Sequence, residues 1–299
     1  MNAWFEDFVA YLRYERNYSE HTVLSYGGSL KAFELYCKSL DNEMTWDTVT
    51  SDVVRAWVVA LLERGLTPSA ACPKLSAVKS FYRFLLKRGM VSADPAYGVH
   101  APKKAKVLPY FVGERDLDFL LEDSNFSKTF EGILERTVVS MLYATGMRAA
   151  ELVALDVSDL DMKGSVISVV GKRRKNRLIP ILPELKSVLE VYLAERKDFL
   201  CRNNADHEAL FVSAQRGMRL TYSALRLMVR GVLSKVTLQS KRSPHVLRHS
   251  FATSMLNHSA DLQSVKELLG HESLRTTAIY THTTFEELKK LYNQAHPRA

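Results

Sequence analysis

A segment that favours neither helix nor strand divides this chain of 299 residues. Residues 100–109 read HAPKKAKVLP, with two prolines, three lysines and no apolar periodicity. Proline lacks a backbone donor and disfavours helix at the preceding residue, so the composition is typical of a linker. We therefore predict two domains, residues 1–100 and 110–299, joined by residues 101–109. With 46% apolar residues overall, each part can form its own core.

Both parts are predicted to be mainly helical, because apolar residues recur at spacings of three and four. Upstream, this pattern predicts four helices, at residues 2–17, 20–40, 50–64 and 68–88. Downstream it covers residues 114–123, 129–144, 183–199 and the region from 221 onward. Residues 165–181 differ: two strand-like runs flank a basic turn, which predicts a β-hairpin. The predicted fold class is mainly α, a four-helix domain followed by an α+β domain with a small antiparallel sheet.

The net charge of +8 and the pI near 9.3 are compatible with a nucleic-acid partner. Residues 1–106 hold 14 basic and 11 acidic residues, which leaves 27 and 22 for the remainder, so both parts are basic. On the helix predicted at 68–88, Lys79, Arg83 and Lys87 recur every four residues, away from an apolar stripe of Leu75, Val78, Tyr82, Leu85 and Leu86. These cations are either DNA contacts or a solvated basic face, and Phe81 and Phe84 are expected to pack inside.

Several classes of protein are disfavoured. Cys37, Cys72 and Cys201 are scattered and odd in number, so we expect neither disulfides nor a zinc site. This cysteine content fits a protein of a reducing compartment. His245 and His249 have the spacing of a zinc motif, but Val246 occupies the position that needs glutamate. We find no secretion signal, lipidation motif or membrane-length apolar run, which predicts a cytoplasmic protein without a membrane partner.

Residues in the second part suit the cleavage of a phosphodiester by a phenol. They are Arg148, Lys172, His245, Arg248 and His271, followed by Tyr280 nine residues later. Guanidinium and imidazole donors can neutralise the negative charge of a phosphoryl-transfer transition state without a metal. A phenol has a pKa of roughly 10, so forming phenolate at neutral pH costs about 4 kcal/mol, which nearby positive charge would lower. Tyr292 is a second option for the nucleophile.

Local spacing suggests how these groups are held. His245 and Arg248 are three residues apart on a helix that Pro244 begins, so both side chains can reach one phosphate. Arg148 precedes Glu151 by one turn, which predicts a salt bridge; a buried structural arginine is the alternative. Lys172, at the tip of the predicted hairpin, can give a proton to a leaving oxygen, or else belongs to a solvated basic turn.

Four segments together resemble the tyrosine recombinase (lambda-integrase) family, and within it the Xer-type recombinases. They read TGMRAAEL (145–152), GKRRKNRLIP (171–180), SPHVLRHSFAT (243–253) and LLGHESLRTTAIYTH (268–282). Near the N-terminus, RNYSEHTVLSY (16–26) is similar to the start of the family's core-binding domain. The resemblance covers essentially the full length. It implies a SAM-like core-binding domain at 1–100 and a catalytic domain at 110–299 that ends in a helix at 285–299.

The resemblance also implies a role for each residue. Tyr280 would attack the scissile phosphate to give a 3′-phosphotyrosyl bond, while Arg148 and Arg248 clamp its non-bridging oxygens. Lys172 would protonate the leaving 5′-oxygen, His245 would serve in acid/base chemistry, His271 would bond the phosphate and Glu151 would support Arg148. Many relatives carry glycine where Arg173 stands, which leaves Lys172 or Lys175 as the proton donor. DNA contacts are expected from Lys79, Arg83, Lys87, Arg173, Arg174 and Lys175. No cofactor or metal is expected.

The expected partner is a double-stranded DNA recombination site. The resemblance implies a homo- or hetero-tetramer on DNA with exchange of the C-terminal helix, and a DNA translocase is a candidate activator. Resolution of chromosome dimers is the preferred role, and a mobile-element integrase or invertase is the rival. A type IB topoisomerase uses the same chemistry but rejoins the original ends. A non-catalytic architectural DNA-binding protein is the remaining alternative.

Overall fold

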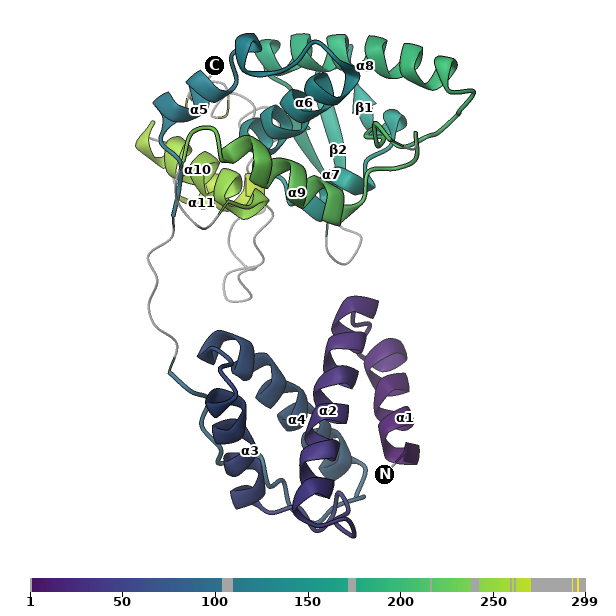
Figure 1. Ribbon diagram of the computed structural model, residues 1–299, viewed down its shortest axis with the longest axis vertical. Helices are drawn as coiled ribbons and strands as arrows, with labels where there is room; N and C mark the ends of the chain where they lie inside the picture. The colour runs from purple at the N-terminus through teal and green to yellow at the C-terminus, as the bar shows by residue number, and fades with distance from the viewer. Residues whose placement is uncertain are drawn as a thin grey trace. The chain divides into compact units, whose positions relative to one another are not determined.

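The computed structural model describes residues 2–103, 110–171, 176–215, 217–237, 242–258, 260, 262–269, 292 and 295. The chain separates into two compact units, Met1–Val107 and Leu108–Ala299 (Figure 1). The assignment of 101–109 as a linker stays a prediction, because residues 104–109 lie outside the described residues. Along the described part of the chain, no helix combines the length and apolar character needed to cross a membrane.

The first unit is a helical domain with α1 (Asn2–Ala10), a π-helical turn (Tyr11–Glu15), α2 (Glu20–Leu40), α3 (Ser51–Glu63) and α4 (Pro68–Lys87). Hydroxyl side chains define three of the starts, because Ser19, Thr50 and Thr67 each accept a hydrogen bond from the backbone N–H three residues later. The four predicted helices are therefore present, except that the first changes to π-helical geometry after Ala10.

Aromatic packing forms the core of this unit. The ring of Phe33 lies 4.8 Å from Trp57, and that of Trp46 lies 5.0 Å from Phe81, between ring centroids. Tyr82 of α4 donates to the backbone carbonyl of Trp46 at 3.0 Å, which fixes the rotation of α4. Phe81 and Phe84 are buried as predicted. The prediction for Leu86 was wrong: it is 43% exposed, because these aromatic rings turn the buried face of α4 away from it.

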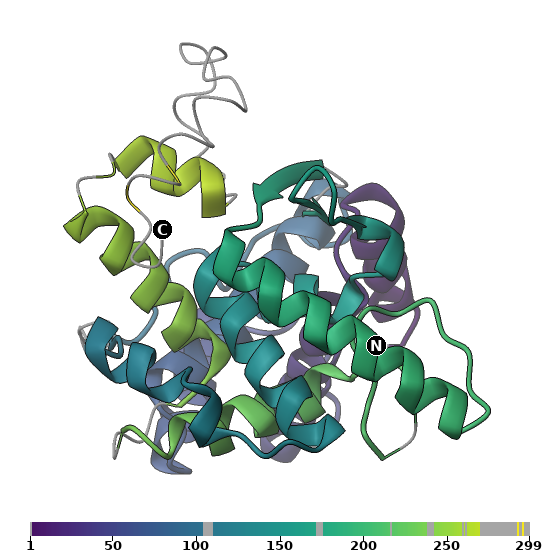
Figure 2. The same ribbon diagram turned by 90° about the horizontal axis from the view of Figure 1, so that it is seen from above.

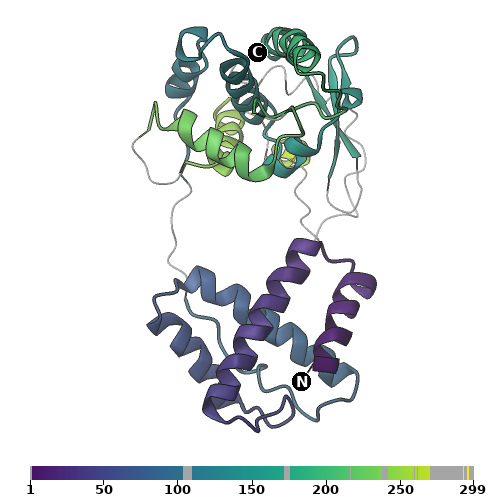
Figure 3. The same cartoon turned by 45° about the vertical axis from the view of Figure 1, so that its right-hand side comes forward.

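The second unit combines helices with a small sheet. Its elements are α5 (Glu114–Leu120), α6 (Phe130–Thr145), α7 (Ala149–Ala154), β1 (Leu160–Asp161), β2 (Val166–Val170), β3 (Asn176–Pro180), α8 (Pro183–Arg202), α9 (Tyr222–Leu233), α10 (Pro244–Asn257) and α11 (Leu262–Leu269). The strands are antiparallel in the order β1-β2-β3, with Val169 opposite Arg177. The sheet lies at one side of the unit (Figure 3).

The helix α6 is the centre of this unit and packs against α8, α9 and α10. Most of its side chains are buried, including the run from Thr137 to Thr145. The long helix α8 covers it and crosses the view of Figure 2. The predicted fold class is confirmed, as is the hairpin within residues 165–181. The short elements α7 and β1 were not predicted.

Candidate phosphate-binding site and family

The end of α6 positions Arg148. The helix stops at Gly146, whose φ of +59° is left-handed, and its N–H donates to the carbonyl of Leu142. A Cβ at Gly146 would lie 2.3 Å from Cδ1 of Phe251 and 2.8 Å from Cδ2 of Leu269, so both the conformation and the space require glycine. Two residues later, Arg148 is the N-cap of α7. The sharp break between α6 and α7 thus places Arg148 at their junction.

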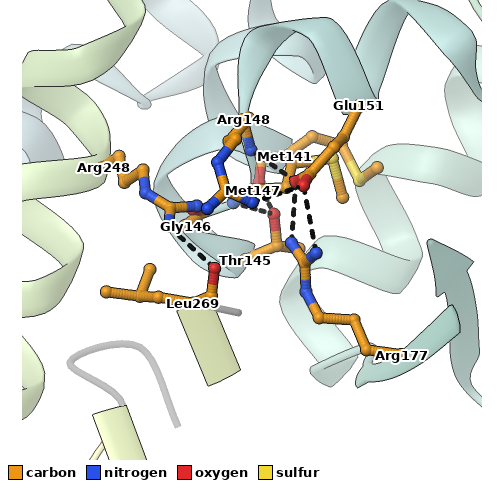
Figure 4. Close-up of polar contacts among 9 residues, drawn as sticks. All are labelled: Met141, Thr145, Gly146, Met147, Arg148, Glu151, Arg177, Arg248 and Leu269. Atoms are coloured by element: carbon orange, nitrogen blue, oxygen red, sulfur yellow. Dashed lines mark hydrogen bonds and ion pairs between the residues drawn. The ribbon is translucent and has the colours of Figure 1, made fainter. Parts of the chain in front are cut away.

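Glu151 holds Arg148 in two ways. Its Oε2 accepts the backbone N–H of Arg148 at 2.8 Å, and its Oε1 accepts Nη1 of the Arg148 guanidinium at 2.8 Å. The predicted salt bridge between these residues is confirmed. Arg177 on β3 also forks onto this carboxylate, Nη1 to Oε1 at 3.1 Å and Nη2 to Oε2 at 2.7 Å (Figure 4). Arg177 was not predicted from the sequence, because its partner is far away in the chain.

These contacts keep Glu151 ionised. The glutamate side chain is only 7% exposed, and burial by itself would raise its pKa. The hydrogen bonds from Arg177 and from the backbone N–H of Arg148 outweigh burial and lower the pKa of Glu151 to about 2. At neutral pH the carboxylate is therefore a fixed negative charge between two guanidinium groups.

Arg248 lies beside Arg148 and is buried, with 8% of the residue exposed. It comes from α10, where its Nη1 donates to the carbonyl of Gly146 at 2.6 Å and its Nη2 to that of Leu269 at 2.7 Å. Burial, followed by the charge of Arg148, lowers the pKa of Arg248 to about 10, so it stays charged at neutral pH. These bonds tie α10 to the ends of α6 and α11 (Figure 4).

The cluster carries excess positive charge. Among the described residues in Figure 4 there are three guanidinium groups, those of Arg148, Arg177 and Arg248, and one carboxylate, that of Glu151, which gives a sum of +2. The guanidinium of Arg148 is the accessible one, because its side chain is 38% exposed against 15% for Arg177. Partly buried positive charge with an open side suits a bound anion.

His245 lies in the first turn of α10, one turn before Arg248, and its side chain is partly exposed. Partial burial lowers its pKa, and the positive fields of His249, Arg248 and Arg148 lower it further. The lowered pKa favours the neutral imidazole, which is the form that can accept a proton. The expectation that His245 and Arg248 lie on one helix that starts at Pro244 is confirmed.

Several predicted site residues lie outside the described residues. They are Lys172, Arg173, Arg174, Lys175, His271 and Tyr280. The choice between Lys172 and Lys175 therefore stays open. Residues next to these positions belong to the cluster of Arg148, Glu151 and Arg248. One is Arg177, which follows Asn176, the residue that pairs with Val170 across the hairpin. Leu269, two residues before His271, accepts the hydrogen bond from Arg248.

Tyr292 is unsuited to be the nucleophile. It is fully buried in the core of the second unit, its hydroxyl donates to the carbonyl of Ala144, and burial raises its pKa. A nucleophilic phenol needs the opposite environment. Ala295 is buried in the same core, so the two described residues of the tail at 285–299 pack on their own chain.

The basic residues of α4 belong to the first unit. Arg83 and Lys87 are exposed, and Lys79 is half-buried. Within the described residues, no salt bridge joins any of the three to a carboxylate, unlike Lys38, which pairs with Glu34 at 2.9 Å. Their role as DNA contacts stays a prediction.

Comparison with known proteins identifies the family of the chain. Residues 117–287 match the phage integrase family, and residues 5–89 match the phage integrase N-terminal SAM-like domain. The tyrosine recombinase XerD of Oceanobacillus iheyensis is 36% identical, with 98% of each chain covered. The tyrosine recombinase XerC of Bacillus subtilis is also 36% identical, over 98% of this chain and 95% of the relative.

Solved structures share the fold. The XerH site-specific recombinase bound to its difH substrate gives a TM-score of 0.69 at 23% identity, over 96% of this chain and 82% of that one. The Tn1549 transposon integrase with transposon end DNA gives 0.72 at 18% identity, over 96% and 97% of the two chains. Given the family match over the second unit and the identity to curated relatives along nearly the whole sequence, the chain belongs to the phage integrase family of tyrosine recombinases.

Proposed function

We propose that this protein is a site-specific recombinase that cleaves and rejoins DNA through a 3′-phosphotyrosyl bond to Tyr280. The observation that carries the proposal is the pair of neighbouring guanidinium groups of Arg148 and Arg248 (Figure 4), with His245 one turn before Arg248 on α10. Membership of the tyrosine recombinase family supports the same chemistry. Arg148, held by Glu151 and open to solvent, and Arg248 would contact the non-bridging oxygens of the scissile phosphate.

The reaction exchanges one phosphodiester for another. The Tyr280 oxygen bonds to phosphorus as the bond to the 5′-oxygen breaks, and the phenolic proton passes to His245. The leaving 5′-oxygen takes a proton from Lys172, or from Lys175 if that lysine is the donor. His271 would donate a hydrogen bond to the phosphate. Because the phosphodiester is kept as a phosphotyrosine, attack by the 5′-hydroxyl of a partner strand restores the DNA without an energy source.

The proposed role is Xer-type resolution of chromosome dimers in the cytoplasm. The names of the relatives, XerC and XerD, support it. Residues 1–100 would form the core-binding domain, contacting DNA through Lys79, Arg83 and Lys87, while Arg173, Arg174 and Lys175 add contacts from the hairpin. Assembly into a homo- or hetero-tetramer with exchange of the C-terminal helix would require Tyr292 to leave the core it occupies in the single chain. A DNA translocase remains the candidate activator.

A suicide substrate tests the chemistry. This is a duplex nicked near the scissile phosphate, so that the released fragment diffuses away and the covalent complex accumulates. We expect wild-type protein and Tyr292→Phe to form an adduct, and Tyr280→Phe to bind DNA but form none. An adduct that persists in Tyr280→Phe would move the nucleophile elsewhere, and no adduct from wild type on its cognate site would favour a non-catalytic DNA-binding protein.

A second assay separates the enzyme classes. The purified protein is given two DNA molecules that carry the same site, together with a supercoiled plasmid. Strand exchange between the two sites is the expected result. Relaxation of the plasmid without exchange would instead indicate a type IB topoisomerase. Mapping the genomic sites bound by the protein then distinguishes a chromosomal site from the ends of a mobile element, the role suggested by the likeness to the Tn1549 integrase fold.

A further inference from the structure

Arg177 of β3 is a charged residue at the site that the proposed mechanism does not use. We propose that Arg177 is a positioning residue, which acts through Glu151 to hold the guanidinium of Arg148 in place for the scissile phosphate. This inference rests on the proposed function.

Each oxygen of the Glu151 carboxylate is shared between the two arginines. Oε1 accepts Nη1 of Arg148 at 2.8 Å and Nη1 of Arg177 at 3.1 Å. Oε2 accepts the backbone N–H of Arg148 at 2.8 Å and Nη2 of Arg177 at 2.7 Å. The fork from Arg177 fixes the plane of the carboxylate. The plane of the carboxylate in turn fixes both the start of α7 and the direction of the Arg148 side chain.

The three side chains also differ in their exposure to solvent. Arg177 is 15% exposed and Glu151 7%, whereas Arg148 is 38% exposed. Arg148 is therefore the side chain that can contact a ligand, and Arg177 supports it from the buried side of the cluster. Its place in β3, opposite Val169 of β2, anchors the cluster to the rigid sheet rather than to a loop.

Charge balance gives Arg177 a second effect on Arg148. With Arg177 present, Glu151 is neutralised by an arginine that does not face the ligand. Without Arg177, the full attraction of a buried carboxylate would act on Arg148 and compete with the phosphate for its N–H groups. The charge sum of the described cluster would also fall from +2 to +1. Arg177 thus makes Arg148 more available for an anion.

The test uses full-length Arg177→Met and Arg177→Lys. Arg136→Met is the control, because the Arg136 side chain is also mostly buried, at 25% exposed, and pairs in the second unit with an exposed carboxylate, that of Asp123, at 2.6 Å. We measure DNA affinity and the single-turnover rate of adduct formation at saturating suicide substrate. We expect Arg177→Met to slow adduct formation by about 100-fold while DNA affinity changes by about threefold or less. Arg177→Lys should recover only part of the rate, because lysine lacks the fork, and Arg136→Met should stay within about twofold of wild type.

A methylphosphonate at the scissile position separates positioning from a general loss of folding. A methyl group replaces one non-bridging oxygen and removes the charge that Arg148 would neutralise. The rate defect of Arg177→Met should therefore be at least about tenfold smaller on this substrate. An equal defect on both substrates, or a normal rate on the phosphodiester, would overturn the inference. Absence of any wild-type adduct would instead count against the proposed function.

Discussion

Glu151 makes the stability of the protein depend on pH. Its pKa is 4.5 when unperturbed and about 2 in the folded chain, so its contribution is complete above pH 4.5 and is lost as the pH falls toward 2. This difference corresponds to about 3 kcal/mol in the free energy of unfolding. Arg148 and Arg177 supply the interaction that the protonated acid gives up.

The variant Glu151→Gln tests this pH dependence. At pH 7 we expect the variant to unfold more easily by about 3–5 kcal/mol, because Arg177 loses a buried partner. Between pH 4.5 and 3, wild type should lose more stability than the variant, which has no carboxylate to protonate at this position. Urea unfolding at several pH values measures both effects. Parallel pH profiles for the two proteins would contradict the assigned pKa.

At the level of elements, the end of α6 determines the site. Gly146 is left-handed, a Cβ at this position would clash with Phe251 of α10 and Leu269 of α11, and its carbonyl accepts a hydrogen bond from Arg248. We expect Gly146→Ala to destabilise the protein by about 2–4 kcal/mol, through the positive φ and overpacking, and to slow adduct formation. Thermal unfolding and the suicide-substrate assay measure these effects.

The matched control for this prediction is Gly231→Ala on α9. A Cβ there meets nothing within 4 Å, so alanine should be neutral or stabilising by about 0.5–1 kcal/mol. If the two variants behaved alike, the packing around Gly146 would not be what holds the junction of α6 and α7.

The basic residues of α4 provide an element-scale test of DNA binding. We expect Lys79→Gln, Arg83→Gln and Lys87→Gln each to weaken affinity similarly for all DNA sequences. If each residue meets one phosphate, each change should reduce the slope of log affinity against log salt by about 1. Lys38→Gln is the control, because Lys38 is on α2 and already pairs with Glu34. An unchanged slope in the three variants would make this face of α4 a solvated surface.

Sequence periodicity predicted the long helices because each buries one face, and in the structure the hydroxyl groups of Ser19, Thr50 and Thr67 cap three of their starts. It missed α7, since six residues are too few to show a period. The Arg148–Glu151 pair was predictable because its partners are one turn apart. Arg177 was not, because only the folded hairpin brings it to Glu151. The burial of Tyr292 likewise depends on a fold that its local sequence does not show.

At the scale of the whole molecule, the two units share the positive charge. Residues 1–106 carry +3 and the remainder +5, by the counts of 14 against 11 and 27 against 22. Each unit has a separate core, so each can present its basic residues independently of the other. If both bind the same duplex, the residues that connect them raise the local concentration of the second unit once the first has bound.

Cutting that connection tests whether both units act on one DNA. A specific protease site is placed within residues 104–109, and affinity is measured before and after cleavage, with protease-treated wild type as the control. We expect cleavage to weaken binding by about 10²–10⁴-fold, because the second contact is no longer intramolecular. We also expect the affinity of the intact chain to fall steeply with added salt, and each separated unit to show a smaller slope. Equal affinity and slope before and after cleavage would mean that one unit alone carries DNA binding, which would contradict the binding of one DNA by both units.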